Sequence, residues 1–452
     1  MRDSLAWRSA AELLAEFSSG TSTPVQAHQA VQEQIAERES ELNALWHQDA
    51  PERVLACAQE SARRWEQGTP RGALDGVPVT VKENVARAGI PMPAGCAGVT
   101  PTIPDRNAPI VERIEAAGGI IIGSTVMPDW GMLSSGVSSL HGITRSPLNP
   151  AWTTGGSSSG AGAATAGGYG PLHVGSDIGG SIRLPGTWLG IPTLKPTSGL
   201  VALDTPYPGR CAGPMARTVD DLSLLLSVIG QHDARDWTSS GGPRSAPGWD
   251  GIDGLRVGLL QDAGCGPESD AEVRAVVDRA AATLTAAGAR VEPVDSWMTP
   301  DLLARLDTFW RVRSYVDYAA LTRDQQAKVL PFIARWVTAA QDVSGARLME
   351  CHRAMDEIAK ATTKATAAYD ILLSPVAPMA AFPAEWPMPW GDSDEGMAHI
   401  GFTVPFNMSG QPAATVNGGF TGDGRPVGIQ IAGQRFADEA ILKIARWFES
   451  GS

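Results

Sequence analysis

Three side chains of this sequence lie in surroundings that could support chemistry: Lys82, Ser157 and Ser181. Lys82 ends a short run of β-branched residues, Ser157 lies in a loop of glycine, serine and threonine, and Ser181 follows two consecutive glycines. A lysine can act as a base only when it is neutral, and burial favours the neutral form by lowering the lysine pKa from about 10.4. Glycines before a serine leave backbone N–H groups free to point into a pocket, as an oxyanion hole requires. The sequence therefore offers a candidate base and a candidate oxyanion hole.

Each of these features also has an interpretation without chemistry. Lys82 on its own could be a strand-end lysine whose ammonium group reaches water. The loop around Ser157 could be a linker, and it lacks the Gly-x-x-x-x-Gly-Lys pattern of a phosphate-binding loop. The segment around Ser181 could be a tight turn, and it differs from the Gly-x-Ser-x-Gly elbow of α/β-hydrolases, which needs a histidine partner. No single motif therefore decides between a structural and a catalytic site.

Alternating helices and strands must position these side chains. Helical periodicity predicts two helices within residues 9–42 and another over 51–67. The β-branched run before Lys82 predicts a strand, and a helix over 110–117 and a buried strand over 120–123 follow it. Strand, helix and strand in this order, punctuated by glycine, are typical of an α/β core.

Two later regions depart from this simple alternation. Residues 131–200 are dominated by small residues, but the apolar residues among them favour backbone packed closely around a site over a flexible linker. Residues 301–368 have a mostly helical pattern and predict a lobe over the core. This lobe holds Trp310 and Trp336, two of 14 tryptophans, which could pack the core or line the mouth of a pocket for a bulky substrate.

Composition excludes several classes of protein. Of the 452 residues, 43% are hydrophobic and 19% are charged, which supports a sizeable core and argues against a disordered chain. A net charge of −13 without a run of lysine and arginine argues against nucleic-acid binding. The first residues include charges, and no run of about 20 apolar residues occurs, so we expect no secretory signal, no membrane span and a cytoplasmic location. The cysteines and histidines show no Cys-x-x-Cys or His-x-x-x-His spacing, so no metal site is expected.

Taken in order, the motifs resemble those of the amidase signature family. Residues 76–84 are similar to the family's lysine strand, residues 155–158 to its glycine–serine loop and residues 177–183 to its nucleophile segment. The two candidate serines are 24 residues apart, which is the spacing of the family. Similar segments continue almost to the end of the chain: Pro192–Thr197, Gly213–Arg217, Pro405–Asn407, Gly410–Pro412 and Pro426–Gly428. The resemblance covers nearly the whole chain and is weakest over about 230–370.

The resemblance implies a role for each of the three side chains. Ser181 would be the nucleophile, Ser157 a bridging serine that follows a non-proline cis peptide bond, and Lys82 the base that finally receives the proton. Asp177 and Arg183 would form a structural pair, and neither a cofactor nor a metal ion is implied. The implied oxyanion donors are the backbone N–H groups of Ile178, Gly179, Gly180 and Ser181, and the implied substrate contacts are Gly131, Met132 and Ser158.

The same resemblance implies a fold and a reaction. The fold would be α/β, with a central, mixed, twisted β-sheet covered by helices on both faces. We expect one amidase domain over residues 1–452, with N-terminal helices over about 1–70, a signature core over about 71–230 and a variable helical lobe over about 300–370. The reaction would be hydrolysis of the C–N bond of small or aryl carboxamides through an acyl-enzyme on Ser181. Carbamates (urethanes) and esters are plausible extensions of the same chemistry.

Departures from the family pattern and other functions stay open. Ser159 occupies a position where the loop often has glycine, and residues 129–131 read Asp-Trp-Gly where many members have Glu-Phe-Ala near the acyl pocket. The chain could instead be the amidase subunit of a tRNA-dependent amidotransferase, or a member that binds without catalysis. A Ser–His triad through His141 or His173 is a further option, although neither lies in a recognisable triad motif. The expected partner is a small-molecule amide or carbamate, without nucleic acid or membrane, and a homodimer is an open option.

Overall fold

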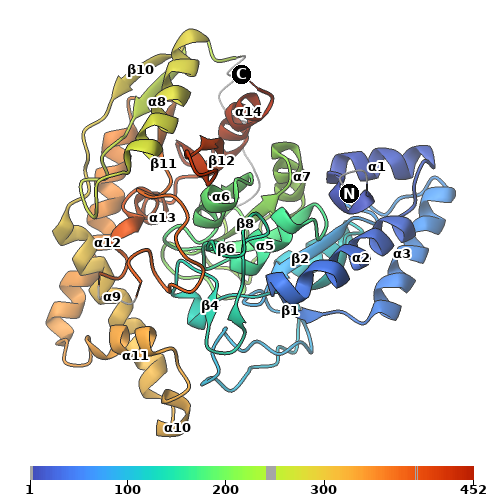
Figure 1. Ribbon diagram of the computed structural model, residues 1–452, viewed down its shortest axis with the longest axis horizontal. Helices are drawn as coiled ribbons and strands as arrows, with labels where there is room; N and C mark the ends of the chain where they lie inside the picture. The colour runs from blue at the N-terminus through green and yellow to red at the C-terminus, as the bar shows by residue number, and fades with distance from the viewer. Residues whose placement is uncertain (1–3, 241–250, 392, 394, 452) are drawn as a thin grey trace.

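A large mixed sheet with helices on both faces organises the molecule (Figure 1). The computed structural model describes residues 4–240, 251–391, 393 and 395–451. Within them, eleven strands follow one another across the sheet in the order β1 (Leu45–Gln48), β3 (Ile120–Thr125), β2 (Pro78–Lys82), β6 (Leu172–Asp177), β8 (Cys211–Ala216), β7 (Thr193–Lys195), β12 (Ala413–Phe420), β13 (Pro426–Gly433), β11 (Ile371–Pro375), β9 (Arg256–Leu259) and β10 (Arg290–Pro293). A small hairpin of β4 (Val137–Ser138) and β5 (Gly142–Ile143) forms a separate pair. The structure therefore confirms the predicted α/β class and the mixed central sheet.

Parallel and antiparallel pairs occur side by side in this sheet. β2 pairs in parallel with β3 and with β6, whereas β6 pairs antiparallel with β8. Because β2 and β6 are parallel neighbours, their carboxyl ends lie at the same edge of the sheet. Ligands of open α/β sheets bind outside such an edge.

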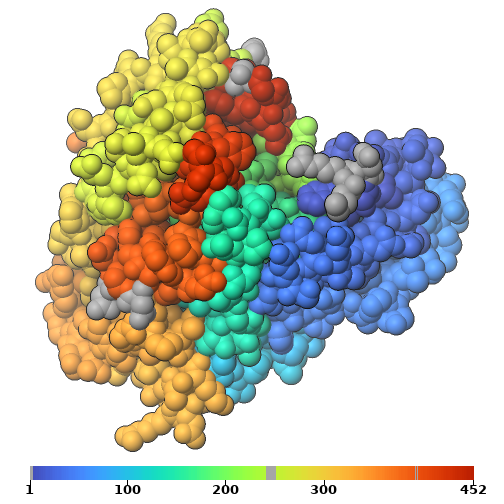
Figure 2. Space-filling view, viewed as in Figure 1, coloured from blue at the N-terminus to red at the C-terminus, as the bar shows by residue number. Residues whose placement is uncertain are grey.

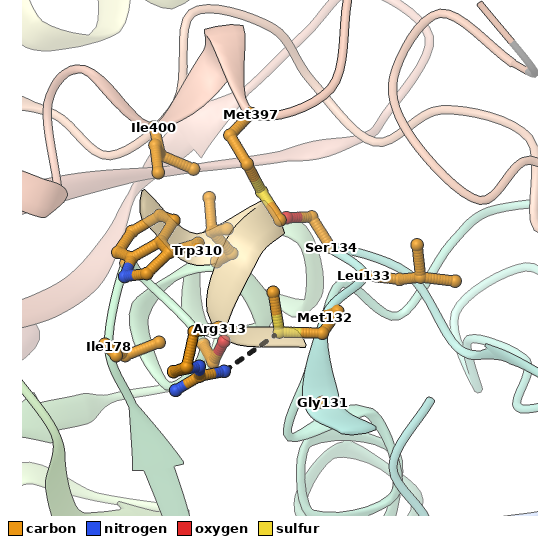
Figure 3. A pocket seen from close by; sticks show the side chains of 12 residues that line it. Gly131, Met132, Leu133, Ser134, Ile178, Trp310, Arg313, Met397 and Ile400 are labelled. Carbon is orange, nitrogen blue, oxygen red and sulfur yellow. Dashed lines mark hydrogen bonds between the residues drawn. The ribbon is translucent and has the colours of Figure 1, made fainter. Parts of the chain in front are cut away.

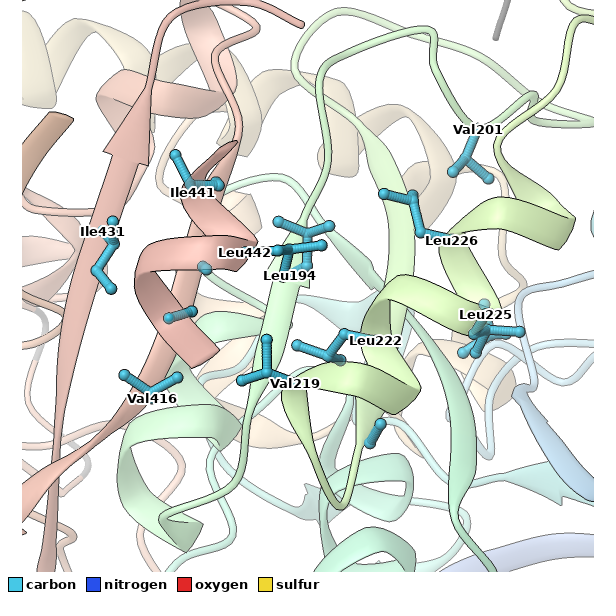
Figure 4. Close-up of a cluster of buried hydrophobic side chains, with 14 of the residues drawn as sticks. Leu194, Val201, Val219, Leu222, Leu225, Leu226, Val416, Ile431, Ile441 and Leu442 are labelled. Atoms are coloured by element: carbon cyan, nitrogen blue, oxygen red, sulfur yellow. The ribbon is translucent and has the colours of Figure 1, made fainter. Parts of the chain in front are cut away.

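Side chains that alternate along the strands divide the core into two layers. On β12, Ala414 and Val416 join the cluster on one face, and Ala413 joins a cluster on the other. Four helices cover the first face: α4 (Pro109–Ala116), α7 (Val219–Ile229), α8 (Ala271–Ala286) and α14 (Asp438–Glu449). Figure 4 shows the apolar side chains that α7 and α14 direct toward the strands.

Two short helices beside the candidate serines were not predicted from the sequence. Almost every residue of α5 (Ser159–Gly167) and α6 (Arg183–Leu189) is buried, so these helices lack the polar stripe that reveals a surface helix. Small residues are required because α5 passes close to other backbone, and a Cβ on Gly160 would lie 2.2 Å from the carbonyl oxygen of Ala44. The interpretation of this region as closely packed backbone therefore agrees with the structure.

The N-terminal helices and the lobe occur where the pattern predicts them. The first group consists of α1 (Ala10–Ser19), α2 (Pro24–Leu42) and α3 (Pro51–Glu66). The lobe consists of α9 (Pro300–Ala319), α10 (Arg323–Gln326), α11 (Pro331–Thr338) and α12 (Gly345–Thr366). The two groups lie on opposite sides of the view, with the teal segment between them (Figure 2). No helix within the described ranges combines the length and the apolarity needed to span a bilayer.

Candidate active site

The pairing of β2 with β6 brings the candidate residues to one edge of the sheet. Lys82 is the last residue of β2, and Ser181 lies on the turn that follows β6. Ser157 comes from the loop directly before α5 and lines one open cavity together with Ser181. Lys82 lies behind Ser157 and is fully buried. Lys82 and Ser157 are 75 residues apart in the sequence, and Ser157 and Ser181 are 24 apart. All three nevertheless meet at the edge where α/β sheets bind their ligands.

Lys82 has two serine hydroxyls as partners. Its Nζ lies 2.8 Å from Ser157 Oγ and 3.1 Å from Ser158 Oγ. Burial, reinforced by the positive charge of Arg210, lowers the pKa of Lys82 to about 7. A large share of the lysine is therefore neutral near pH 7, and a neutral amine has a lone pair that can accept a proton from a serine hydroxyl.

Glycine is needed at two positions that surround Ser157. The peptide bond between Gly156 and Ser157 is cis. A Cβ on Gly156 would lie only 2.4 Å from the carbonyl oxygen of Ser135. Gly131 has a φ of +69°, and a Cβ there would lie 3.2 Å from Ser157 Oγ. A larger residue at either position would displace the loop that carries Ser157.

The Asp177 carboxylate fixes the turn that carries Ser181. It accepts hydrogen bonds from the N–H groups of Gly180 at 2.8 Å and Ile182 at 3.0 Å. Arg183 donates to both carboxylate oxygens, at 2.9 and 3.1 Å. Burial on its own raises the pKa of Asp177, but the charge and hydrogen bonds of Arg183 outweigh it and hold this pKa well below its usual range. The turn is therefore held by a charged carboxylate.

The same ion pair extends to the C-terminal part of the chain. Arg183 Nη1 donates to the Thr403 carbonyl oxygen and to Gln430 Oε1, each at 2.8 Å, and Nη2 donates to Asn407 Oδ1 at 2.6 Å. All of these side chains are buried. Such a fully hydrogen-bonded network fits the structural role that the sequence predicts for Asp177 and Arg183.

We expect Arg183→Met to lower the free energy of unfolding by about 3 kcal/mol, because the buried Asp177 carboxylate would lose its compensating charge. Urea unfolding at pH 7 measures this change. The matched variant Arg235→Met removes a more exposed ion pair with Asp233 and Glu112 and should cost less than about 1 kcal/mol. Equal losses in the two variants would contradict a special role for the buried network.

The turn occupies one of the four predicted oxyanion donors. The Gly180 N–H donates to the Asp177 carboxylate at 2.8 Å. Among the hydrogen bonds of the described residues, none uses the N–H of Ile178, Gly179 or Ser181. These three groups stay the predicted oxyanion donors.

Two of the three predicted substrate contacts line the cavities beside Ser181, and the third does not. Gly131 and Met132 line both cavities that meet at Ser181. Ser158 lines neither of them. Its Oγ lies behind the cavity, within reach of Lys82 and donating to the Ser176 carbonyl oxygen at 3.1 Å. Ser158 is therefore placed to hold the lysine, and its role as a substrate contact stays a prediction.

Two cavities of different character share the Ser181 side chain. The inner cavity has a wall of apolar side chains (Figure 3): Met132, Leu133, Leu184, Trp310, Met397 and Ile400. The open cavity includes Ser157 and has a more polar mouth at Tyr207, Arg210 and Arg313. The inner cavity suits an apolar or aromatic group.

Sequence reasoning found only part of this wall. Of the two lobe tryptophans, Trp310 lines the inner cavity, whereas Trp336 packs inside the lobe and donates to Asp307 Oδ1 at 3.0 Å. Arg313 and Met397 were missed, because nothing in their local sequence marks them as wall residues. The one available signal was that Arg313 follows Trp310 by three positions, which places both on one face of a helix.

Neither His141 nor His173 forms the alternative Ser–His arrangement in the described part of the chain. The His141 ring contacts Glu83 Oε2 at 2.7 Å, and the His173 ring contacts Thr80 Oγ1 at 2.7 Å and the Gly170 carbonyl oxygen at 3.1 Å. Neither ring reaches a serine of the cavity. Within the described ranges, no group of three or more histidine, cysteine, aspartate or glutamate residues is arranged to hold a metal ion.

Comparisons with known proteins match this chain over most of its length. The family model described as Amidase matches residues 26–442. An acylamidase from Rhodococcus erythropolis is 32% identical, over 99% of this chain and 96% of that protein. A glutamyl-tRNA(Gln) amidotransferase subunit from Symbiobacterium thermophilum is also 32% identical, over 97% and 95% of the two chains.

Solved structures show the same fold. The crystal structure of a bacterial aryl acylamidase of the amidase signature enzymes superposes with a TM-score of 0.87 and 25% identity, over 99% of this chain and 96% of that one. A 6-aminohexanoate cyclic dimer hydrolase in complex with its substrate superposes with a TM-score of 0.82 and 26% identity, over 98% and 97%. Both likenesses extend over the sheet, the helices on its two faces and the lobe.

Proposed function

Because this chain belongs to the amidase family and is therefore an amidase signature hydrolase acting on C–N bonds, we propose that its substrates are small or aryl carboxamides. The observation that carries the proposal is the buried Lys82, whose lowered pKa leaves a large share of it neutral and whose Nζ lies 2.8 Å from Ser157 Oγ. Ser157 in turn lines one cavity together with Ser181. Aryl carbamates and esters are the proposed extensions, since their acyl groups can form the same kind of intermediate.

In the proposed mechanism, Ser181 Oγ attacks the carbonyl carbon of the amide. Its proton passes to Ser157 Oγ while the Ser157 proton passes to Lys82 Nζ. The carbonyl oxygen becomes an oxyanion, and the N–H groups of Ile178, Gly179 and Ser181 donate to it. One such donor contributes on the order of 3 kcal/mol to the stability of the transition state.

Collapse of the tetrahedral intermediate breaks the C–N bond. An amine leaves poorly as an anion, so the proton on Lys82 returns through Ser157 to the leaving nitrogen. The acyl group stays on Ser181 as an ester. Water then attacks this ester with the same proton relay, which releases the carboxylic acid and restores the Ser181 hydroxyl.

The two cavities receive the two halves of the substrate. The leaving nitrogen must lie near Ser157, which supplies its proton, and only the open cavity includes Ser157. The acyl group therefore occupies the inner cavity, where Trp310 and Ile400 provide an apolar wall. This division favours an apolar or aromatic acyl group of limited size.

A substrate panel tests the proposal. The purified chain is incubated with an anilide, a primary amide and an aryl ester that share one acyl group, and with an N-aryl carbamate whose carbonyl carries an alkoxy group in place of that acyl chain. We expect release of the arylamine from the anilide, and the rates at which the other compounds release ammonia, arylamine or phenol define the preference. Turnover of none of the four would overturn the proposed substrate class.

A role within a tRNA-dependent amidotransferase is the second candidate function, because relatives with that name match over nearly the whole chain. A chain of that kind works together with partner chains. Amine release from simple anilides by this chain alone would count against it, whereas activity that requires added partner chains would support it.

A further inference from the structure

Two arginines at the mouth of the open cavity have no carboxylate partner among the described residues. Arg210 Nη1 donates to the Thr205 carbonyl oxygen at 2.9 Å, and its Nη2 donates to the Asn84 carbonyl oxygen at 3.4 Å. Arg313 Nη2 lies 3.6 Å from Met132 Sδ (Figure 3), and its buried Nε has no hydrogen-bond partner. Thioether sulfur and backbone carbonyls do not cancel a guanidinium charge. Both charges are therefore available to a ligand.

The two guanidinium groups share one aromatic ring. The Arg210 guanidinium carbon lies 5.5 Å from the centroid of the Tyr207 ring, and that of Arg313 lies 5.0 Å from it. Cation–π contacts of this kind orient a guanidinium group without neutralising it. Tyr207 thus holds two positively charged guanidinium groups near each other. A bound anion would relieve the repulsion between them by forming charge-assisted hydrogen bonds.

The acidic residues of the same cavity form no ion pair with these arginines. Asp177 lines it but is buried in its ion pair with Arg183. Asp317 is exposed, and although it lies four residues after Arg313 on α9, no ion pair within 4.0 Å joins them in the structure. The cavity mouth is therefore positive on a chain whose net charge is −13.

We propose that this mouth binds a carboxylate on the amine half of the substrate, so that the preferred amides are N-acylated amino acids or aminobenzoates. The inference rests on the proposed function, because the open cavity is the one assigned to the leaving amine. Arg210 and Arg313 would each donate charge-assisted hydrogen bonds to the carboxylate. The inner cavity contains Arg313 but not Arg210, so a carboxylate that meets both must lie on the amine side.

The positive charge of Arg210 also lowers the pKa of Lys82. This effect offers a second reason, besides anion binding, for an arginine at position 210. Arg313 does not contribute to that effect. Replacement of Arg313 therefore separates anion binding from the tuning of Lys82. Arg210→Gln serves as the second variant, and it should additionally shift the pH profile of kcat/KM to higher pH.

Two anilides with one acyl group provide the test: the anilide of 4-aminobenzoate, which is anionic, and that of 4-aminoacetophenone, which is neutral and of similar shape and electron demand. The quantity measured is the ratio of kcat/KM for the anionic substrate to kcat/KM for the neutral one. A general loss of activity in a variant lowers both values by the same factor and leaves this ratio unchanged. We expect the wild type to favour the anionic substrate and Arg313→Gln to lower the ratio about tenfold, the size expected from losing a charge-assisted hydrogen bond. Asp317→Asn should raise the ratio.

The control variant is Arg311→Gln on the same helix, because Arg311 pairs with Asp307 and does not line either cavity. Its ratio should match that of the wild type. Added NaCl should lower the wild-type ratio by screening the charges. A wild-type ratio near one that Arg313→Gln leaves unchanged would overturn the anion site while the hydrolase assignment stands. Release of neither amine would overturn both.

Discussion

Replacing Ser181 with alanine is expected to lower kcat/KM for an aryl amide on the order of 10⁵-fold, to the level left by the oxyanion donors and binding alone. The variant has no hydroxyl that can form the acyl-enzyme. Ser181 is only partly exposed and its side chain makes no hydrogen bond among the described residues, so its loss should leave the free energy of unfolding nearly unchanged. Release of a chromophoric amine measures the activity.

Ser227→Ala is the matched control, since Ser227 is an exposed serine of α7 that lies outside the walls of both cavities. It should keep wild-type activity. A fluorophosphonate probe should label the wild type and Ser227→Ala and fail to label Ser181→Ala. Activity that survives in Ser181→Ala would show that another group attacks the carbonyl.

Lys82→Met is expected to change activity and stability in opposite directions. Without the base, kcat/KM should fall about 10³- to 10⁴-fold, as for other losses of general acid–base catalysis. Stability at pH 7 should rise on the order of 2 kcal/mol, because removal of a buried ionisable group outweighs the lost hydrogen bonds to Ser157 and Ser158. Activity assays and urea unfolding of the same preparation measure both.

The stability gain of Lys82→Met is expected to depend on pH. In the folded protein the pKa of Lys82 is about 7, below its ordinary value of 10.5. Between these values the unfolded chain binds more protons than the folded chain, so this lysine makes wild-type stability rise with pH. The stability gain of Lys82→Met should therefore be largest at pH 7 and below and shrink toward pH 10. Wild-type activity should fall as the pH drops below 7.

The exposed Lys360→Met is the control for these measurements, because Lys360 lies on the surface of α12. It should change neither activity nor the pH dependence of stability. A Lys82→Met variant that is less stable than the wild type at pH 7 would contradict the inference that burial of the Lys82 amine lowers the free energy of unfolding.

The sequence could single out the candidate catalytic side chains because each stands in a local motif. The strand that ends at Lys82 and the glycine pair before Ser181 are visible within a few residues. The engagement of Gly180 could not be predicted, because it depends on how the Asp177 side chain turns back on its own loop. That turn is visible only in three dimensions.

Specificity was harder to predict than chemistry for a related reason. The inner cavity combines Met132 with Trp310 and Ile400, which come from three segments that are far apart along the chain. A lobe residue such as Arg313 becomes part of a cavity wall only when the lobe packs over the sheet. The general α/β fold follows from alternating helices and strands, but the wall of the pocket follows from how the last third of the chain packs on the first.

The network around Arg183 also sets the order of events when the chain is made. The loop with Ser181 is held through Arg183 by Asn407 and Gln430, which a ribosome adds more than 200 residues later. A nascent chain that already contains the three proposed catalytic side chains therefore still lacks the support for the Ser181 loop. Since segments emerge from the N-terminus onward, the loop that carries Ser181 gains this support only after Gln430 has been added.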